Sequence, residues 1–210
     1  MAAPVQPPLL RDGDRLTRDE FLRRWEEMPD LKHAELIDGV VYMPSPVSDV
    51  HDEFHSRMSY WLGSYAALSP NCRHGITGSW LMSSDSVPQP DLTLRIRPER
   101  GGQSRLEGKY AAGAPELIVE ISHTTAAKDK GVKLRLYERS GVREYITVMP
   151  EEQEIVWREL VNGRYREIAP DEDGLYRSRV FPGLWLDPAA LWAGDLAGLA
   201  TAVQKGVARR

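Results

Sequence analysis

The sequence has almost no cysteine and no long apolar run. Cys72 is the only cysteine among 210 residues, so an intramolecular disulfide and a thiolate zinc cluster are both excluded. No apolar stretch approaches the ~20 residues that a membrane-spanning helix needs. The first ten residues do not combine a basic start with an apolar run, so we expect no signal peptide. These absences favour a reducing, cytoplasmic location without a membrane partner.

The chain also lacks an excess of positive charge. It has 27 Lys and Arg against 31 Asp and Glu, a formal net charge of -4. Such a surface attracts phosphate backbones weakly, which excludes a coating role on nucleic acid but leaves room for a local basic cleft. Hydrophobic residues make up 41% and charged residues 28%, a balance that is typical of a globular protein.

The order of the patterns predicts one domain with alternating helices and strands. Residues 1–14 are rich in proline and polar groups and indicate a loose tail; residues 15–203 form the domain, and residues 204–210 look frayed. Thr17 and Glu20 form a capping box that starts a helix ending near Met28. Asp38-Gly39, between two apolar runs, predicts a type I′ hairpin. We further predict helices over 50–68, 126–139 and from about 188; strands over 91–96, 117–121, 145–148 and 175–180; a hairpin of 154–160 against 164–168; and a surface loop over 98–113.

Two carboxylates stand where a metal ion could be bound. Glu120 is the one charged residue in an otherwise apolar strand, a costly position unless it is paired or binds a metal. Asp91 opens another strand directly after Pro90. Mg²⁺ prefers oxygen ligands of this kind, completed by water and substrate phosphate. Lys133, on the helix after the Glu120 strand, could supply a cation; it shares a helical face with Asp129 and Tyr137.

Each of these residues also has a simpler interpretation. Glu120 could form a buried salt bridge, with Lys133 as its partner, and Lys133 could instead be a solvated helix lysine. Glu35 is either an exposed hairpin residue or part of the site. His51 is better interpreted as a packed or capping histidine, with a contribution to the site as the less favoured alternative. Tyr137 is interpreted as a core residue. Ser122 and His123 lack the Gly-x-Ser-x-Gly elbow of a serine hydrolase.

Taken in order, the motifs resemble the Uma-two family, a restriction-endonuclease domain within the PD-(D/E)XK nuclease superfamily. The resemblance extends from about Thr17 to Leu191. The matching stretches are Glu35-Leu-Ile-Asp-Gly, Pro90-Asp91-Leu, Pro115-Glu-Leu-Ile-Val-Glu120-Ile-Ser, Asp129 with Lys133-Leu and Tyr137, and Gly141-Val-Arg-Glu-Tyr145.

The resemblance implies an α/β fold with a restriction-endonuclease-like central mixed sheet flanked by helices, followed by the C-terminal β-hairpin. It also implies that Asp91 and Glu120 are metal ligands, with the Ile121 carbonyl as a third ligand and Glu35 as an additional acidic residue. The sequence departs from the superfamily signature at Ser122, where a lysine is expected, and at His123, where the family usually has proline. The resemblance assigns the catalytic lysine to Lys133, with Lys128 and Lys130 close to it in sequence.

The expected function is a Mg²⁺- or Mn²⁺-dependent endonuclease that hydrolyses phosphodiester bonds in nucleic acid, with DNA as the expected substrate and a homodimer as the expected assembly. The cations of residues 128–139 could attract phosphate locally. The alternative is a non-catalytic nucleic-acid or protein binding module that retains the fold. An enzyme for smaller phosphodiesters is a third possibility.

Overall fold

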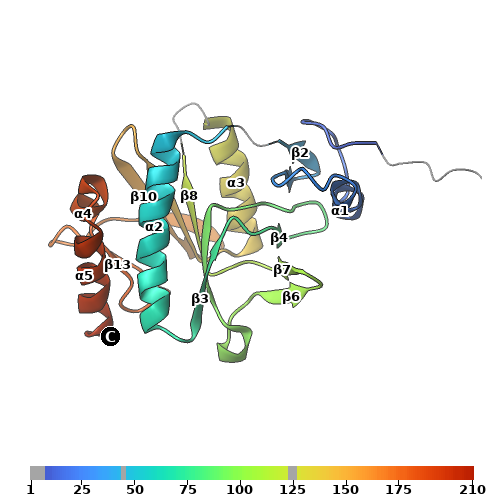
Figure 1. Cartoon of the computed structure of the whole chain (residues 1–210). Coiled ribbons are helices and arrows are strands. Elements are labelled where there is room, and N and C mark those ends of the chain that lie inside the picture. Colours follow the sequence, from blue (N-terminus) through green and yellow to red (C-terminus); the bar gives the residue numbers. More distant parts are fainter. Residues whose placement is uncertain (1–7, 44–45, 123–126) are drawn as a thin grey trace, which may run out of the picture.

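The fold is built around a six-stranded mixed sheet (Figure 1). The computed structural model describes residues 8–43, 46–122 and 127–210, the last range without the side chains of 127–130. The strand order is β11-β10-β9-β8-β5-β3, and only β8 and β9 run parallel. This arrangement confirms the predicted central mixed sheet and the hairpin that follows it. The strands are β3 (Cys72–Ile76), β5 (Leu92–Ile96), β8 (Leu117–Ile121), β9 (Glu144–Met149), β10 (Glu154–Val161) and β11 (Arg164–Ile168).

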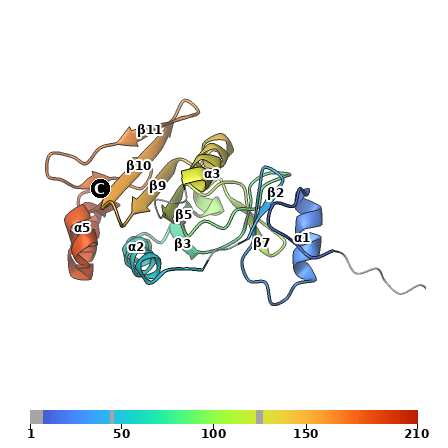
Figure 2. The ribbon, with the colours of Figure 1, turned by 90° about the horizontal axis from the view of Figure 1, so that it is seen from above.

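Helices cover both faces of this sheet (Figure 2). On one face lie α2 (Asp49–Leu68), α4 (Pro188–Ala193) and α5 (Leu196–Val207), which share the largest hydrophobic core with the strands. On the other face lies α3 (Ala127–Ser140), packed on Ile118 and Tyr145. Because strand residues alternate between the faces, β8 directs Val119 toward α2 and Ile118 toward α3.

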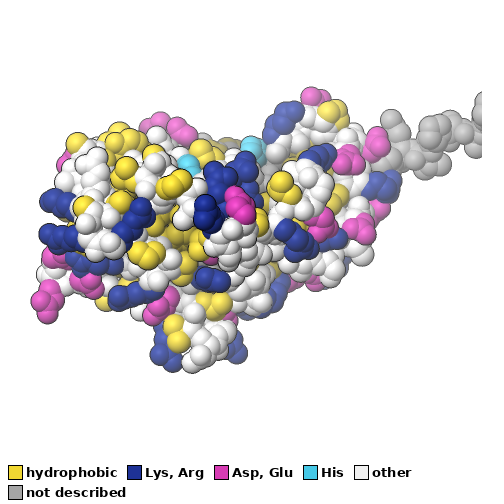
Figure 3. Space-filling view, turned by 90° about the horizontal axis from the view of Figure 1, so that it is seen from below, with side chains coloured by type: hydrophobic (Ala, Val, Ile, Leu, Met, Phe, Trp, Pro, Cys, Tyr) yellow, Lys and Arg dark blue, Asp and Glu magenta, His cyan; other side chains and the backbone are white. Residues whose placement is uncertain are grey.

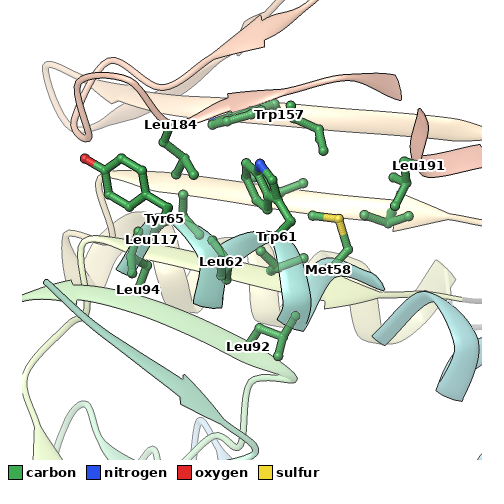
Figure 4. Packing of buried hydrophobic residues seen from close by; sticks show 14 of the residues in the cluster. Met58, Trp61, Leu62, Tyr65, Leu92, Leu94, Leu117, Trp157, Leu184 and Leu191 are labelled. Carbon is green, nitrogen blue, oxygen red and sulfur yellow. The ribbon is translucent and has the colours of Figure 1, made fainter. Parts of the chain in front are cut away.

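The apolar stripe of α2 forms the centre of the larger core (Figure 4). Met58, Trp61 and Leu62 are fully buried there against the strands. The Trp61 ring meets Trp157 edge-on, with centroids 5.9 Å apart, and its indole N–H donates to the Trp185 carbonyl at 2.8 Å. This packing fixes α2, whose first turn reaches the candidate site described below.

A smaller layer lies beside the sheet and has its own core around Phe21, Leu36 and Val87. It contains α1 (Arg18–Glu26), the hairpin of β1 (Glu35–Ile37) and β2 (Val40–Tyr42), and a three-stranded sheet of β4 (Trp80–Leu81), β7 (Tyr110–Ala112) and β6 (Arg105–Glu107). Thr17 caps α1 by accepting from the Glu20 N–H, as predicted. Asp38 and Gly39 both have positive φ, 53° and 75°, which is the type I′ turn that the Asp-Gly pair favours.

Three predicted segments differ from the structure. Residues 98–113 are not a plain loop but contain a 3-10 turn, η1 (Pro98–Arg100), and the β6–β7 hairpin. Within the tail predicted over residues 1–14, residues 1–7 lie outside the described part, while Leu10 is buried in the smaller core. The end of the chain is not frayed, because α5 continues to Val207 and the Arg210 guanidinium donates to the Ser69 hydroxyl.

The segment before the C-terminal helices is also more compact than predicted. A two-residue strand, β12 (Tyr176–Arg177), pairs with β13 (Trp185–Leu186) in place of the longer strand expected over 175–180. The expected terminal helix is divided in two at Gly194, which has a φ of 69°. No helix in the described part of the chain is long and apolar enough to cross a bilayer.

Candidate functional site

Glu120 projects from β8 into the layer between the sheet and α3, where its side chain is 10% exposed. The Tyr137 hydroxyl donates to its Oε1 at 2.6 Å, and the Lys133 ammonium donates to the same oxygen at 3.1 Å. Tyr137 and Lys133 lie four residues apart on α3, so one helical face presents both donors. The salt bridge that the sequence left open is therefore present.

Lys133 also contacts a second carboxylate. Its Nζ lies 3.0 Å from Oε1 of Glu35, although Glu35 belongs to the β1–β2 hairpin at the other end of the site. The same Glu35 oxygen accepts the main-chain N–H of Gln89 at 2.7 Å, which fixes the carboxylate toward the lysine. Glu35 is therefore not an exposed hairpin residue, and Lys133 is not a solvated one, because their side chains are only 20% and 16% exposed.

Asp91 precedes β5 and is held by main-chain and side-chain groups. Its Oδ2 accepts the Ile121 N–H at 2.8 Å and lies 3.3 Å from Nε2 of His51 on α2. The N–H and C=O of a strand residue point to the same side, so the Ile121 carbonyl also faces Asp91. The Asp91 carbonyl accepts the N–H of Thr77 at 2.9 Å and lies 3.1 Å from Nε2 of His55.

The charges of the site oppose one another. Burial raises the pKa of Glu120, and the carboxylates of Asp91 and Glu35 raise it further against the opposing effect of Lys133. Burial alone would lower the pKa of Lys133, but the surrounding carboxylates overcome it and hold that pKa above its usual value. For Asp91, burial is outweighed by His51 and Lys133, which hold the pKa of this carboxyl below its usual value. The lysine therefore stays charged among three carboxylates.

A cavity of about 490 Å³ opens beside these groups. Glu35, Asp91 and Lys133 line it, together with His51, His55 and Thr77. Its walls thus combine a cation, carboxylates and imidazoles from α2, α3, β1 and the loops before β4 and β5. A space of this size is typical of small-molecule sites.

The donor set fits a hard divalent cation better than a soft one. Among the described residues, Asp91 Oδ1 and Glu120 Oε2 have no protein hydrogen-bond partner, which leaves one oxygen of each carboxylate for a cation. Oxygen ligands of this type suit Mg²⁺ or Mn²⁺. No group of three or more His, Cys, Asp or Glu side chains in the described part is arranged to hold a metal. A bound ion would therefore need a main-chain carbonyl or water in addition to Asp91 and Glu120.

The structure brings together all the residues singled out from the sequence: Glu35, Asp91, Glu120, Ile121 and Lys133. Lys128 and Lys130 fall outside the side chains that are described. Arg139, part of the proposed basic patch on α3, forms an ion pair with Asp38.

Two residues have a larger role than the sequence indicated. His51 was interpreted as a packed or capping residue, but its ring contacts Asp91 in the cavity. Tyr137 was interpreted as core; it is buried, and it also bonds Glu120. The spacing of His51 and His55, four apart at the start of α2, was the available signal, because it places both imidazoles on one helical face.

Comparison with known proteins gives the family and the fold. The family model described as "Putative restriction endonuclease" (Uma2) matches residues 18–189. The chain is similar to a solved structure described as "a putative nuclease belonging to DUF820" from Anabaena variabilis, with a TM-score of 0.66 and 19% identity over 85% of this chain and 98% of that one. No curated protein matches the sequence. Since the family model covers most of the chain, the protein belongs to the Uma2 family, and its fold is that of a nuclease.

Proposed function

We propose that this protein is a metal-dependent endonuclease that hydrolyses phosphodiester bonds, with DNA as its substrate. The family to which it belongs supports a nuclease. The metal and the roles of individual residues are inferred from the geometry of the site, and the DNA substrate from the family.

The observation that carries the proposal is the position of Lys133. The strand position that would hold the lysine of the superfamily signature is occupied by Ser122. Lys133 brings its ammonium within 3.1 Å of Glu120 from α3 instead, and it lines the same cavity as Asp91. A helix-borne lysine thus supplies the cation that the strand lacks, next to the carboxylates.

In this proposal Asp91 and Glu120 hold Mg²⁺ or Mn²⁺ together with the Ile121 carbonyl. The bound ion would polarise the phosphate and lower the pKa of a coordinated water. Lys133 stabilises the negative charge that grows on the phosphoryl oxygens, and a charge fixed in a partly buried site acts more strongly than one in water.

The surrounding residues position these groups. Glu35 orients the lysine, and the Tyr137 hydroxyl fixes the rotamer of Glu120. The His51 ring and the Ile121 N–H both contact Oδ2 of Asp91 and so fix the orientation of its carboxylate. Such fixed orientation reduces the reorganisation needed when the substrate reacts.

One observation favours the alternative of a non-catalytic binding module. Oε1 of Glu120 already accepts from Tyr137 and Lys133, so the charge of the carboxylate is paired without a metal ion. A closed ion-pair network of this kind could serve structure alone.

Cleavage assays separate the two functions. Supercoiled plasmid and short single strands are incubated with the protein in EDTA, Mg²⁺ or Mn²⁺, beside the Lys133→Met variant. The nuclease proposal expects nicking or cutting with metal only, and at least a hundredfold slower cutting by the variant, as for loss of a transition-state charge contact. Binding of either substrate without any cleavage under these conditions would favour the binding module.

We also propose a homodimer, since cutting both strands of a duplex needs two sites. Light scattering at high micromolar concentration tests this, and a monomer there would contradict it. The cytoplasmic location remains a prediction.

A further inference from the structure

A second cavity, of about 520 Å³, lies between the edge of the central sheet and the β6–β7 hairpin. Gly75 of β3 and Thr93 of β5, which are cross-strand partners, line it. Its walls carry Trp80 and Tyr110. The cations that line it are Arg73, Arg95 and Lys109.

This cavity opens on the sheet face that carries Glu120. Thr93 of β5 is paired with Ile118 of β8, and paired residues project to the same face. Ile118 faces α3, as does Glu120 two residues later. Arg95, two residues after Thr93, therefore shares the face of the candidate catalytic groups.

Arg73 and Arg95 stand directly opposite each other on the antiparallel strands β3 and β5. Neither forms an ion pair with any residue in the described part of the chain. Arg95 lies over the Trp80 ring, 5.4 Å from its centroid, and burial together with Arg73 lowers the pKa of its guanidinium. Like charges in this cross-strand position destabilise a sheet, so the pair costs stability unless an anion lies between them.

Positive charge continues past this pair. Arg97 and Arg100, in and before η1, also form no ion pair in the described residues. Glu116, fully buried, accepts the N–H groups of Ile96 and Gln103 and so fixes the loop that bears them. Lys and Arg side chains gather near the centre of this lower face of the molecule (Figure 3). Arg97 and Arg100 do not line the groove itself, and Lys109, which does, pairs with Glu26. Arg73 and Arg95 are therefore the cations of the groove that have no ion pair among the described residues.

The groove meets the first cavity, the one lined by Asp91 and Lys133 and called the catalytic cavity below, at one short segment. Ile76 and Gly78 line the groove, while Thr77 between them lines the catalytic cavity. Across the same boundary, the Gln89 side-chain amide donates to the Ser79 hydroxyl at 3.0 Å. Thr77 has a φ of 45°, a strained conformation for a β-branched residue, held by its bond to the Asp91 carbonyl.

We propose that this groove, centred on Arg73 and Arg95, binds the phosphates of a nucleic-acid strand on one side of the bond that is cut. The inference rests on the proposed function, which places the scissile phosphate beside Asp91. Strand β3 rises about 10 Å from Arg73 to Ile76, the length of about three base steps of a duplex. The contacts are made to the backbone, so binding there does not depend on base sequence.

Fluorescence anisotropy in EDTA tests the groove without catalysis. The probes are a fluorescein-labelled 20-nucleotide single strand and the matching duplex, titrated with the full chain between 50 and 200 mM NaCl. Arg73→Gln with Arg95→Gln should weaken binding at least about tenfold, the effect of losing charge-assisted contacts. The negative slope of log affinity against log salt should become less steep, by about 1.4, for the single strand.

The matched control is Arg143→Gln with Arg166→Gln. It removes the same charge from two exposed arginines, one directly before β9 and one on β11, that have no ion pair among the described residues. Its affinity should stay within about twofold of the wild type. An equal loss in both double variants, no loss in either, or no binding by the wild type would overturn the proposal.

A second variant guards against misfolding. Arg73→Glu places an acid opposite Arg95 and replaces repulsion by a cross-strand ion pair. It should melt no lower than the wild type and still lose binding; a stable Arg73→Glu variant with wild-type affinity would also overturn the groove. Displacement of the strand by millimolar inorganic phosphate at constant ionic strength would show that the groove binds any small anion. That result would also contradict the proposal.

Parallel cleavage assays keep the two proposals apart. If the wild type binds through Arg73 and Arg95 but never cuts, the groove stands and the nuclease function fails. If it cuts and the double variant binds and cuts equally well, the nuclease function stands and the groove fails.

Discussion

The Tyr137 hydroxyl donates a 2.6 Å hydrogen bond to Oε1 of Glu120 inside the layer between α3 and the sheet. Because Lys133 donates to the same oxygen, the two α3 residues control one carboxylate together. The ring of Tyr137 also packs edge-on against Tyr145, 5.2 Å between centroids. The hydroxyl can thus be removed without removing the packing.

Tyr137→Phe should lower the free energy of unfolding by about 1.5 kcal/mol, the value of a hydrogen bond to a charged group. Because burial raises the pKa of Glu120 to about 7, urea denaturation is carried out at about pH 8.5, where the carboxylate is charged. Tyr165→Phe is the control, because its hydroxyl donates to the neutral Val142 carbonyl and its loss should cost about 1 kcal/mol. A Tyr137→Phe variant as stable as the wild type would show that Glu120 does not need this donor.

Lys133→Met should destabilise the protein by about 3 kcal/mol, because it leaves Glu120 and Glu35 buried without their cation. Lys205→Met, on the exposed face of α5, should change stability by less than about 0.5 kcal/mol. Chemical denaturation compares the two. Equal effects would mean that the Lys133 ion pairs contribute nothing beyond a surface contact.

Asp91→Asn should remove the response of the protein to metal. For wild type in Mn²⁺ at ten times its Kd, linkage stabilises the fold by about 1.4 kcal/mol, a rise of about 3 °C in melting temperature. Asp91→Asn should show no such rise. Lys133→Met should keep the rise, since a lysine is not a metal ligand. Melting curves with EDTA and with Mn²⁺ decide this, and an unresponsive wild type would refute the metal site.

The same curves test what holds Asp91 without metal. His51 and Lys133 hold the pKa of Asp91 below its usual value, so its charged form is favoured in the folded protein. Asp91→Asn should therefore melt below the wild type in EDTA at pH 7. A higher melting temperature would mean that repulsion from Glu120 and Glu35 dominates instead.

Glu138 should make stability depend on pH at the acidic end. The Tyr165 N–H, and then Arg164, hold the pKa of Glu138 below its ordinary 4.5. The pKa of Glu138 is lower in the folded than in the unfolded protein. Its ionised carboxylate therefore stabilises the fold fully above about pH 4.5, and this stabilisation is lost as the pH falls through the folded-state pKa. Glu138→Gln should melt about 1–2 °C below wild type at pH 7, with the difference shrinking toward pH 3. A constant difference would exclude this titration.

The sequence was most informative where chemistry was local. The lone carboxylate in the apolar strand 117–121 drew attention to Glu120. Asp38-Gly39 specified its turn because both residues take positive φ. Thr17 identified the start of α1 for a similar reason: its hydroxyl accepts from an N–H three residues away.

Tertiary relationships were not accessible in this way. The β6–β7 hairpin has three-residue strands in a charged, glycine-rich stretch, and its register with β4 is set by residues far apart in sequence. His51 meets Asp91 only because α2 packs across the sheet. The pairing of Arg73 with Arg95 depends on the register of β3 against β5. The basic residues of α3 are visible in the sequence, but two of them, Lys133 and Arg139, form ion pairs within the protein.

Glu116 recognises its loop solely through main-chain N–H groups, those of Ile96 and Gln103. Any amino acid except proline offers the same donor, so Glu116 places no demand on the side chains of residues 97–100. Gly101, with a φ of 86°, and Gly102, where an added Cβ would lie 2.0 Å from the Ile96 carbonyl oxygen, do require glycine. Glutamine, the closest substitute in shape, would turn an NH₂ group toward one of those N–H donors and lose the contact. Relatives of this protein can therefore change the charge carried by the loop, and with it the strength of nucleic-acid binding, without rebuilding the sheet that supports it.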